Sequence, residues 1–370
     1  MFEFSKSQIN QLQKRGISVA NAKAMIANIS QQNTYCNIHR PAALGDGIIE
    51  FSTTDLQYYA KLYSDTASNF QVARFIPASG MATRMFSFLS PLVLEDRQAF
   101  VKALEAHQDS PKVKQFLEGY RYFSFYESMK EQIEREYKTT SDSIDFLQVF
   151  IQAVVKQYAN QPKAFVPFHK YGENSRTAIE EQLMYAVQFA LVNNRIAHHF
   201  TISPGLEEAF DQHVKEACLA LERTHACTTD IDYSVQEAST DSLVIDADGQ
   251  LVTDDQGQLV FRAGGHGALL QNLNNIDADL VFINNIDNVS PQAQHEESGM
   301  YKRVLGGCLL HIQQEVFRLL RTIDEEGVLE EAIHFLDQQF HVHIQEDDIA
   351  LRKQKVIDRL NRPLRIGGMV

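Results

Sequence analysis

The sequence contains no long apolar run. Nowhere do about 18 consecutive apolar residues occur, the length that a membrane-spanning helix needs. The N-terminal stretch MFEFSKSQINQLQKRG is polar and lacks the apolar core of a secretory signal peptide. These two absences predict a cytoplasmic protein with no membrane partner.

The 370 residues allow one large domain or two ordinary ones with a substantial core.

Clustered basic residues and paired cysteines are also absent. The formal net charge is −14, and no strong run of lysine and arginine appears. Because neutralising nucleic-acid phosphates needs such clusters, the sequence argues against a general nucleic-acid partner, although a local basic pocket stays open. The four cysteines form no CxxC pair, which predicts reduced structural thiols. The thirteen histidines lack companions at a metal-ligand spacing.

Short apolar runs alternate with amphipathic stretches over much of the chain. A helix is expected to begin at Ser203 and Pro204. Two Asp/Gln-Gly turns in SLVIDADGQLVTDDQGQLVF predict a β-hairpin that projects from the sheet. The alternation predicts an α/β fold with a mixed, mostly parallel sheet flanked by helices. The expected strands are Val72 to Ile76, KAFVPF, IAHHFTI, IDYSVQ and DLVFIN.

The same periodicity predicts the domain organisation. A helical N-terminal lead-in covers residues 1–70, and the α/β core covers residues 71–325. A helical insertion interrupts the core at about 87–160, with Pro111 suited to a helix start. Residues 326–370 are expected to form a helix and a strand, NRPLRIGGMV. This end is either a native strand docked on the sheet or the end of a fragment.

The loop after the first expected strand is rich in small residues. In PASGMATRM, residues 77–85, Ser79, Gly80 and Ala82 let backbone N–H groups approach an anion, and the next helix adds its positive end. Arg84 has the planar guanidinium that binds phosphate oxygens bidentately. An ordinary structural turn explains the same residues, so the loop alone leaves both interpretations open.

A second segment gathers positive charge. PKAFVPFHKYGENSRTAIEEQL, residues 162–183, brings Lys163, Lys170 and Arg176 close to a strand and to a helix start. Thr177 or Ser175 is available as the cap of that helix. The three cations predict an anion site. The alternative is that the lysines are simply solvated.

A third segment joins a glycine turn to an aspartate. In residues 261–288, Gly264 and Gly265 lack Cβ atoms, so a base or a phosphate can lie against the main chain beside His266. The strand DLVFIN then ends near Asp287, and ligands of parallel sheets bind at the carboxyl ends of strands. A carboxylate there suits Mg²⁺, which shares oxygen ligands with substrate phosphates. The alternative is an aspartate that caps the next helix.

These segments, in this order, resemble the motifs of sugar-1-phosphate nucleotidyltransferases, particularly the UDP-sugar pyrophosphorylases. The first loop of that family reads Leu-Ala-Gly-Gly-x-Gly-Thr-Arg-Leu/Met. PASGMATRM is similar to it at Ala78, Gly80, Thr83, Arg84 and Met85. It departs from the family, which has glycine at these places, at Ser79, Ala82 and Phe86.

Further segments carry the resemblance over about residues 72–290. PKAFVPF and AIEEQL are similar to the family's Pro-Lys-x-Leu-x-Pro motif and Ile-Glu helix, which matches Lys163 to its phosphate-binding lysine. HFTISPGLEEAF resembles a strand ending in Thr-Ser. YSVQ resembles Phe-x-Gln, which matches Gln236 to a glutamine that contacts uracil. GGHGALLQNL is similar to the family's glycine segment, and FINNIDNV closely resembles Phe-Val-x-Asn-Ile-Asp-Asn.

The resemblance implies a nucleotide-diphospho-sugar transferase fold of the GT-A type. It implies transfer of a nucleotidyl group from UTP, or another nucleoside triphosphate, to a sugar-1-phosphate with release of pyrophosphate. The implied catalytic residues are Arg84, Lys163 and Asp287, with Asp287 as the Mg²⁺ ligand. The implied nucleotide-binding residues are Ala78, Ser79, Gly80, Thr83, Gln236, Gly264 and Gly265. The implied substrate-binding residues are His266 and Asn285.

Two other functions stay open on the same fold. Ser79 and Ala82 also fit a non-catalytic protein that binds a nucleotide or a sugar nucleotide and whose first loop has diverged. A glycosyltransferase is the third alternative. Such an enzyme is expected to carry an Asp-x-Asp motif at a strand end, and this sequence has none there. The whole chain also resembles an uncharacterised bacterial family, a domain of unknown function whose members are longer at the C-terminus. That resemblance favours a C-terminally truncated fragment.

Overall fold

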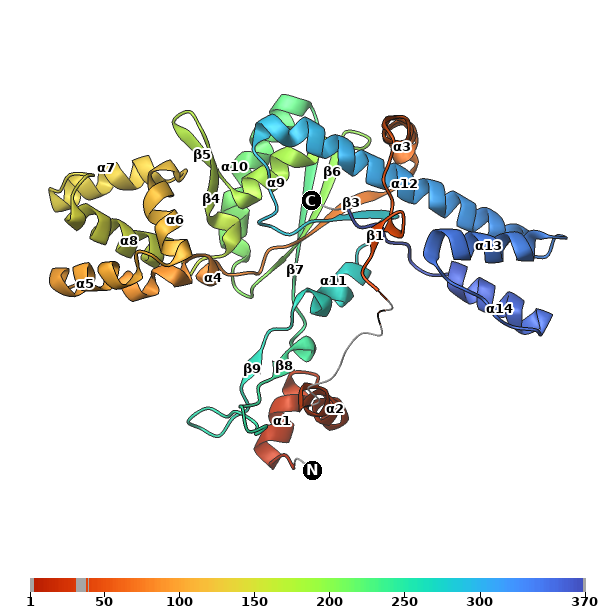
Figure 1. The fold of residues 1–370 in the computed structure, drawn as a ribbon, viewed down its shortest axis with the longest axis horizontal. Helices are drawn as coiled ribbons and strands as arrows, with labels where there is room; N and C mark the ends of the chain where they lie inside the picture. The colour runs from red at the N-terminus through yellow and green to blue at the C-terminus, as the bar shows by residue number, and fades with distance from the viewer. Residues whose placement is uncertain (1–2, 31–37, 39, 369–370) are drawn as a thin grey trace. The chain divides into compact units, whose positions relative to one another are not determined.

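The computed structural model describes residues 3–30, 38 and 40–368. The chain forms two compact units, which are coloured by residue number in Figure 1. The sheet unit comprises Met1–Thr34 and Val72–His295, and the helical unit comprises Tyr35–Gln71 and Glu296–Val370. This division differs from the predicted domain boundaries, because residues 35–71 group with the C-terminal helices.

A four-stranded parallel sheet lies at the centre of the sheet unit. Its order is β10, β3, β6, β7, and every neighbouring pair is parallel. Figure 1 labels β3, β6 and β7. Its strands are β3 (Val72–Pro77), β6 (Arg195–Ile202), β7 (Thr228–Val235) and β10 (Leu280–Ile283). Parallel strands need crossover connections, and α10 (Glu207–His225) and α11 (Leu270–Asn274) lie in two of them. The predicted α/β fold with a mostly parallel sheet flanked by helices is confirmed.

Helices α9 (Ala178–Ala186) and α10 bury one face of the sheet. Ile76 of β3 and Phe200 of β6 are fully buried there. They share a hydrophobic core with Leu183 of α9 and Phe210 of α10. A central parallel strand is covered on both faces, which explains why β3 has an almost continuous apolar sequence.

Local side-chain chemistry sets where these helices begin. Of the two residues expected as the cap of α9, Thr177 takes this position. It forms a capping box with Glu180 in which each side chain bonds the other residue's backbone N–H. The predicted start of α10 at Ser203 and Pro204 was wrong, because this helix begins at Glu207. Gly205 lies between them with φ +79°, a left-handed conformation that a right-handed helix cannot include.

The predicted helical insertion has a hydrophobic core of its own. Phe100, Phe146, Phe150 and Ile151 are fully buried within it. Pro111 occupies the first turn of its helix, where its missing N–H has no intrahelical partner to lose. The short helix α4 (Thr83–Phe86) precedes this segment, whose helices are α5 (Arg97–His107), α6 (Pro111–Gly119), α7 (Tyr126–Tyr137) and α8 (Ile144–Tyr158).

The two N-terminal helices pack against the extension that follows β7. Leu12 of α1 (Lys6–Lys14) and Ile26 of α2 (Val19–Ser30) share a core with Leu243 and Leu259 of this extension. Its antiparallel strands β8 (Ser242–Leu243) and β9 (Phe261–Arg262) confirm the predicted hairpin.

Four long helices lie in the described part of the helical unit. A Cβ atom on Gly307 of α12 would lie 1.9 Å from the carbonyl oxygen of Tyr59 in α3, so only glycine permits this close helix crossing. No helix among the described residues is both long and apolar enough to span a membrane. The elements of this unit are α3 (Thr53–Thr66), α12 (His295–Thr322), α13 (Val328–Phe340), α14 (Ile349–Leu360), β1 (Ala43–Leu44) and β2 (Gly47–Ile48).

The predictions of two strands were wrong. Residues 361–368 form no strand, and Pro363 lacks the N–H that sheet pairing requires. KAFVPF joins no strand of the main sheet. It begins with a single 3-10 turn, η4 (Lys163–Phe165), and then enters a separate antiparallel hairpin of β4 (Pro167–Tyr171) and β5 (Asn174–Thr177).

The prediction of reduced cysteines is confirmed where the structure describes them. Cys218, Cys227 and Cys308 are free thiols. Burial raises the pKa of Cys218 and of Cys308 to about 11, which makes both thiols unreactive near neutral pH. Cys36 lies outside the described residues.

Candidate functional site

Two loops meet at the carboxyl ends of β3 and β10. The chain passes from β3 to β6 and β7 on one side, then returns to β10 on the other side of β3. The strand order therefore reverses between β3 and β10, and ligands of open parallel sheets bind at such a reversal. Pairing continues past β10, because the N–H of Ile286 donates to the carbonyl of Pro77 (3.3 Å). This bond brings the turn that carries Asp287 beside the loop after β3.

The loop Ala78–Ala82 is fixed at both ends and unpaired in the middle. Its first N–H donates to a β6 carbonyl (2.8 Å), and its last donates to the carbonyl of Gln161 (2.9 Å). The N–H groups of Ser79, Gly80 and Met81 make no hydrogen bond within the described residues. A Cβ atom on Gly80 would meet no atom within 4 Å. Three consecutive unpaired N–H groups beside open space form an arrangement that can bind an anion.

Backbone pairing brings Lys163 to this loop. The N–H of Lys163 donates to the carbonyl of Gly80 (2.9 Å), and Met81 forms a β-bridge with Pro162. Ala164 and Phe165, which follow in η4, are buried in the core under the sheet. The position of Lys163 is thus fixed by the backbone and by packing, while its side chain stays partly exposed.

Lys163 and Asp287 form an ion pair at the mouth of the two loops. The distance from Lys163 Nζ to Asp287 Oδ2 is 2.5 Å. The two side chains are 23% and 34% exposed, so a phosphate or a cation can reach both from solvent. The structure therefore brings together two of the three predicted catalytic residues, which lie far apart in the sequence.

Arg84 and Thr83 follow the loop in the short helix α4. Arg84 is exposed and makes no ion pair with another described residue. The Thr83 hydroxyl donates to the carbonyl of Ala159 (2.9 Å), so it ties α4 to the end of α8. The guanidinium of Arg84 is thus near the loop in sequence and free in orientation, but it does not join the Lys163–Asp287 pair.

A second group of predicted residues lies after β7. The Gln236 amide donates to Thr240 Oγ1 (3.1 Å). A Cβ atom on Gly264 would lie 3.5 Å from the Gln236 amide nitrogen, 2.8 Å from Ala268 Cβ and 2.9 Å from the Thr240 carbonyl oxygen. Gly264 is therefore a glycine because a neighbouring backbone occupies the space of a side chain. Gln236 and the glycine turn, far apart in sequence, are neighbours in the structure.

The two groups lie at opposite edges of the sheet. β7 and β10 are three strand spacings apart, and with about 4.8 Å between neighbouring strands this corresponds to about 14 Å. The remaining predicted residues are exposed: Gly265 and His266 in the glycine turn, and Asn285 beside Asp287. The carbonyl of Asn285 accepts from the Gln182 amide (2.9 Å), and the carbonyl of Gly265 accepts from the N–H of Ala268 (2.9 Å).

Arg176, one of the three cations predicted for an anion site, instead belongs to a buried polar cluster. Its guanidinium lies over the Tyr171 ring (4.3 Å) and 3.8 Å from the carboxylate of Glu181, which is fully buried. The Tyr171 hydroxyl (2.6 Å) and His169 Nδ1 (3.0 Å) bond the same carboxylate. Burial and the bond to Glu181 raise the pKa of Tyr171. No motif in the sequence indicated this cluster.

The charged groups of the site fit one hard cation together with a substrate. Among the described residues, no three His, Cys, Asp or Glu side chains are grouped to hold a metal ion alone. Asp287 nevertheless presents a partly exposed carboxylate at the strand end. Mg²⁺ is commonly held by one or two carboxylates plus substrate phosphates and water, and Asp287 fits that pattern.

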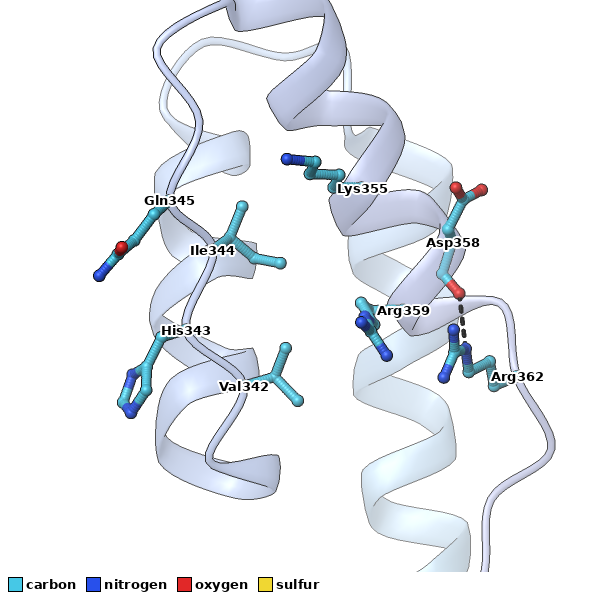
Figure 2. A pocket seen from close by; sticks show the side chains of 8 residues that line it. All are labelled: Val342, His343, Ile344, Gln345, Lys355, Asp358, Arg359 and Arg362. Carbon is cyan, nitrogen blue, oxygen red and sulfur yellow. Dashed lines mark hydrogen bonds between the residues drawn. The ribbon is translucent and has the colours of Figure 1, made fainter. Parts of the chain in front are cut away.

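A pocket of about 500 Å³ lies in the helical unit, between residues 342–345 and α14. Figure 2 shows Val342 and Ile344 pointing toward α14, and His343 and Gln345 pointing away from it. The pocket's lysine, Lys355, is already paired with Glu346 (2.7 Å). None of the residues predicted for the functional site lines this pocket.

A family model described as "Domain of unknown function (DUF4301)" matches residues 5–370. Neither the curated proteins nor the solved structures include a match to the chain.

Proposed function

We propose that this chain, which belongs to the DUF4301 family, is a sugar-1-phosphate nucleotidyltransferase of the UDP-sugar pyrophosphorylase kind. The observation that carries the proposal is the Lys163–Asp287 contact at the reversal of strand order, beside three unpaired loop amides. Nucleotidyl transfer needs no protein nucleophile. It needs aligned phosphates and charge neutralisation, which a cation, a carboxylate and oriented N–H groups supply. The proposal includes a GT-A type of fold for the sheet unit.

The reaction is an in-line displacement at phosphorus. A phosphate oxygen of the sugar-1-phosphate attacks the α-phosphorus of UTP, and the bond from that phosphorus to the oxygen bridging to the β-phosphate breaks. Pyrophosphate leaves with the electron pair. The N–H groups of Ser79 and Gly80, together with Arg84, bind phosphate oxygens of the triphosphate. Lys163 leaves Asp287 and binds the oxygens of the departing pyrophosphate, where negative charge develops.

Asp287 is the residue that holds Mg²⁺ in this proposal. The bound ion supplies positive charge to the phosphate oxygens. When Lys163 turns to the triphosphate, the Asp287 carboxylate loses its counter-ion and becomes available as an oxygen ligand. The ion pair thus keeps both side chains in place before substrate binds.

The second group of residues would bind the nucleoside. Gln236 and the backbone of Gly264 and Gly265 are assigned to the base. The separation of about 14 Å between the outer strands is of nucleotide scale. His266 and Asn285 are exposed and are assigned to hydroxyls of the sugar or ribose.

One specific observation favours the alternative, a non-catalytic protein that binds a nucleotide or sugar nucleotide. The N–H of Ala82 already bonds the Gln161 carbonyl, and the Ala82 side chain is fully buried in the core of the insertion. At this position the loop therefore offers no N–H group to a phosphate. Such a loop can bind a nucleotide with fewer contacts and without catalysis.

The test is pyrophosphate release from UTP and Mg²⁺ with a panel of sugar-1-phosphates. We expect release by the native chain and its loss in Asp287→Asn, with unchanged circular dichroism. The exposed Asp248→Asn is the matched control and should behave as the native chain. UDP-sugar binding without pyrophosphate release would reject the enzyme in favour of the binding protein. Consumption of UDP-sugar without pyrophosphate would indicate a glycosyltransferase.

A further inference from the structure

Arg74 is a buried cation with no acidic partner. It lies in β3, is fully buried, and makes no ion pair with any described residue. Burial lowers the pKa of its guanidinium to about 9. Nη1 donates to the Gln182 carbonyl and Nη2 to Gln182 Oε1 (2.5 Å), while the Phe189 ring lies 5.1 Å away. A buried charge is costly, so its retention needs a structural or functional reason.

Arg74 fixes the orientation of the Gln182 amide. A guanidinium has only donors, so the group that faces it must be the amide oxygen. The amide nitrogen of Gln182 therefore points the other way. It donates to the carbonyls of Asn285 (2.9 Å) and Asn288 (3.1 Å) and lies 3.4 Å from that of Ile286. One side-chain amide thus contacts three carbonyls of a single turn.

That turn carries Asp287. The N–H of Asn288 donates to the carbonyl of Asn285 (3.1 Å), which closes a tight turn around the aspartate. The N–H of Ile286 attaches the turn to β3 at Pro77. Gln182 bonds the backbone of the turn from inside the protein, and Lys163 forms an ion pair with the Asp287 carboxylate at the surface.

We infer that Gln182, oriented by Arg74, is a positioning residue that holds the turn 285–288 so that the Asp287 carboxylate faces Lys163. Its consequence for catalysis rests on the proposed function. Its effect on the turn does not, because the hydrogen bonds involved join only residues of the chain. Gln182 touches neither phosphate nor metal in this role and acts only through the turn.

Gln182→Glu separates positioning from folding. The glutamate keeps the size of the side chain and gives Arg74 the carboxylate that it lacks, so the fold should keep its melting temperature. The same change removes the N–H donor and directs an oxygen toward three carbonyls. We expect at least tenfold faster hydrogen exchange at the amides of residues 286–288, and at least tenfold weaker binding of UTP with Mg²⁺.

A matched control exists in the helical insertion. Gln148 is also buried, and its amide nitrogen donates to the carbonyls of Leu94 (2.8 Å) and Glu95 (3.0 Å). Gln148→Glu therefore makes the same chemical change without an arginine partner. It should lower the melting temperature and leave both exchange in the turn and UTP affinity as in the native chain.

A second variant covers the case in which Gln182→Glu does not fold. The double change Arg74→Met with Gln182→Met removes the buried charge and the donor together, with apolar side chains of similar length. It should fold, and exchange in the turn should again be faster. Native exchange rates in every folded variant, or loss of folding in both, would overturn the inference. Faster exchange in a chain whose native form binds no UTP would support the positioning role and reject the proposed function alone.

Discussion

Two carboxylates of the sheet unit, Glu181 and Asp287, lie in opposite environments. Glu181 is fully buried and bonds the Tyr171 hydroxyl (2.6 Å) and His169 Nδ1 (3.0 Å). Asp287 is about one-third exposed, and Lys163 is its one ion-pair partner among the described residues. A buried acid with several partners stabilises the fold, because removing it leaves those partners unpaired. A partly exposed acid with one partner can exchange that partner for a ligand.

The structural role of Glu181 follows from what its partners connect. His169 and Tyr171 lie in the hairpin strand β4, whereas His295 begins α12 with Nε2 3.5 Å from the carboxylate. Tyr171 also accepts the N–H of Gln292 (2.9 Å). Glu181 therefore joins α9, the hairpin and the segment after Asp287.

The largest expected effect is on stability, in Glu181→Ala. Removing one member of a buried charged network typically costs about 3–5 kcal/mol, and we expect a loss of that size in the free energy of unfolding by denaturant. The exposed Glu173→Ala, in the turn of the same hairpin, is the control and should change little. If the Glu181→Ala variant were as stable as the native chain but inactive, Glu181 rather than Asp287 would be the functional acid.

The next effect is on catalysis, in Lys163→Ala. By analogy with the loss of one transition-state hydrogen-bond donor, we expect kcat to fall about 10²–10³-fold, or about 2.7–4 kcal/mol. The melting temperature should change little, because the ion pair is partly exposed. Lys170→Ala is the matched control, since Lys170 is exposed and makes no ion pair within the described chain. Equal kcat values in the two variants would remove Lys163 from the site.

A smaller effect is expected in the glycine turn. In Gly264→Ala the new Cβ would lie 2.9 Å from the Thr240 carbonyl oxygen, so the turn must shift. We expect about 1–3 kcal/mol of destabilisation and weaker UTP binding by calorimetry. Gly267→Ala, in the same turn, is the control, because its Cβ would meet nothing within 4 Å. Unchanged UTP affinity in Gly264→Ala would separate this turn from the nucleotide site.

The four strands of the sheet could be predicted because β-branched and aromatic residues recur in each, as a short apolar run in β3 and β10 and in alternation with polar residues in β7. The two wrong strands show the limit of this rule. KAFVPF is equally apolar, but a 3-10 turn at Lys163 and the proline at Pro167 send it into a separate hairpin. Near the C-terminus, Pro363 removes a pairing N–H and residues 361–368 stay outside any sheet.

The residues of the candidate site could be proposed individually from the sequence, but their contacts could not. Lys163 and Asp287 come from different motifs, and only the order of the sheet brings them to 2.5 Å. Arg74 was visible as a lone charge inside the apolar strand VARFIP. Its partner Gln182 lies in a helix that contacts the strand only after folding, so no local pattern indicates the pair.

The smallest expected effect is the acid sensitivity of a buried base. His198 of β6 is 2% exposed, its ring nitrogens have no hydrogen-bond partner among the described residues, and it is the register partner of Arg74. Burial, and then the charge of Arg74, lowers the pKa of His198 well below its usual value. The folded chain thus keeps His198 neutral, whereas the unfolded chain takes up a proton below about pH 6.5. Stability contributed by the neutral ring is present above that pH and is lost as the pH falls.

At pH 5.5 this one group should lower the free energy of unfolding by up to about 1.4 kcal/mol relative to pH 7.5. Denaturant unfolding of the native chain and of His198→Leu at the two pH values measures the effect, because the other titrating groups are common to both chains. The drop in the variant should be smaller by that amount. An equal loss of unfolding free energy in the two chains would mean that the His198 ring is protonated in the folded protein. A buried side chain would then carry a charge as readily as the partly exposed Asp287.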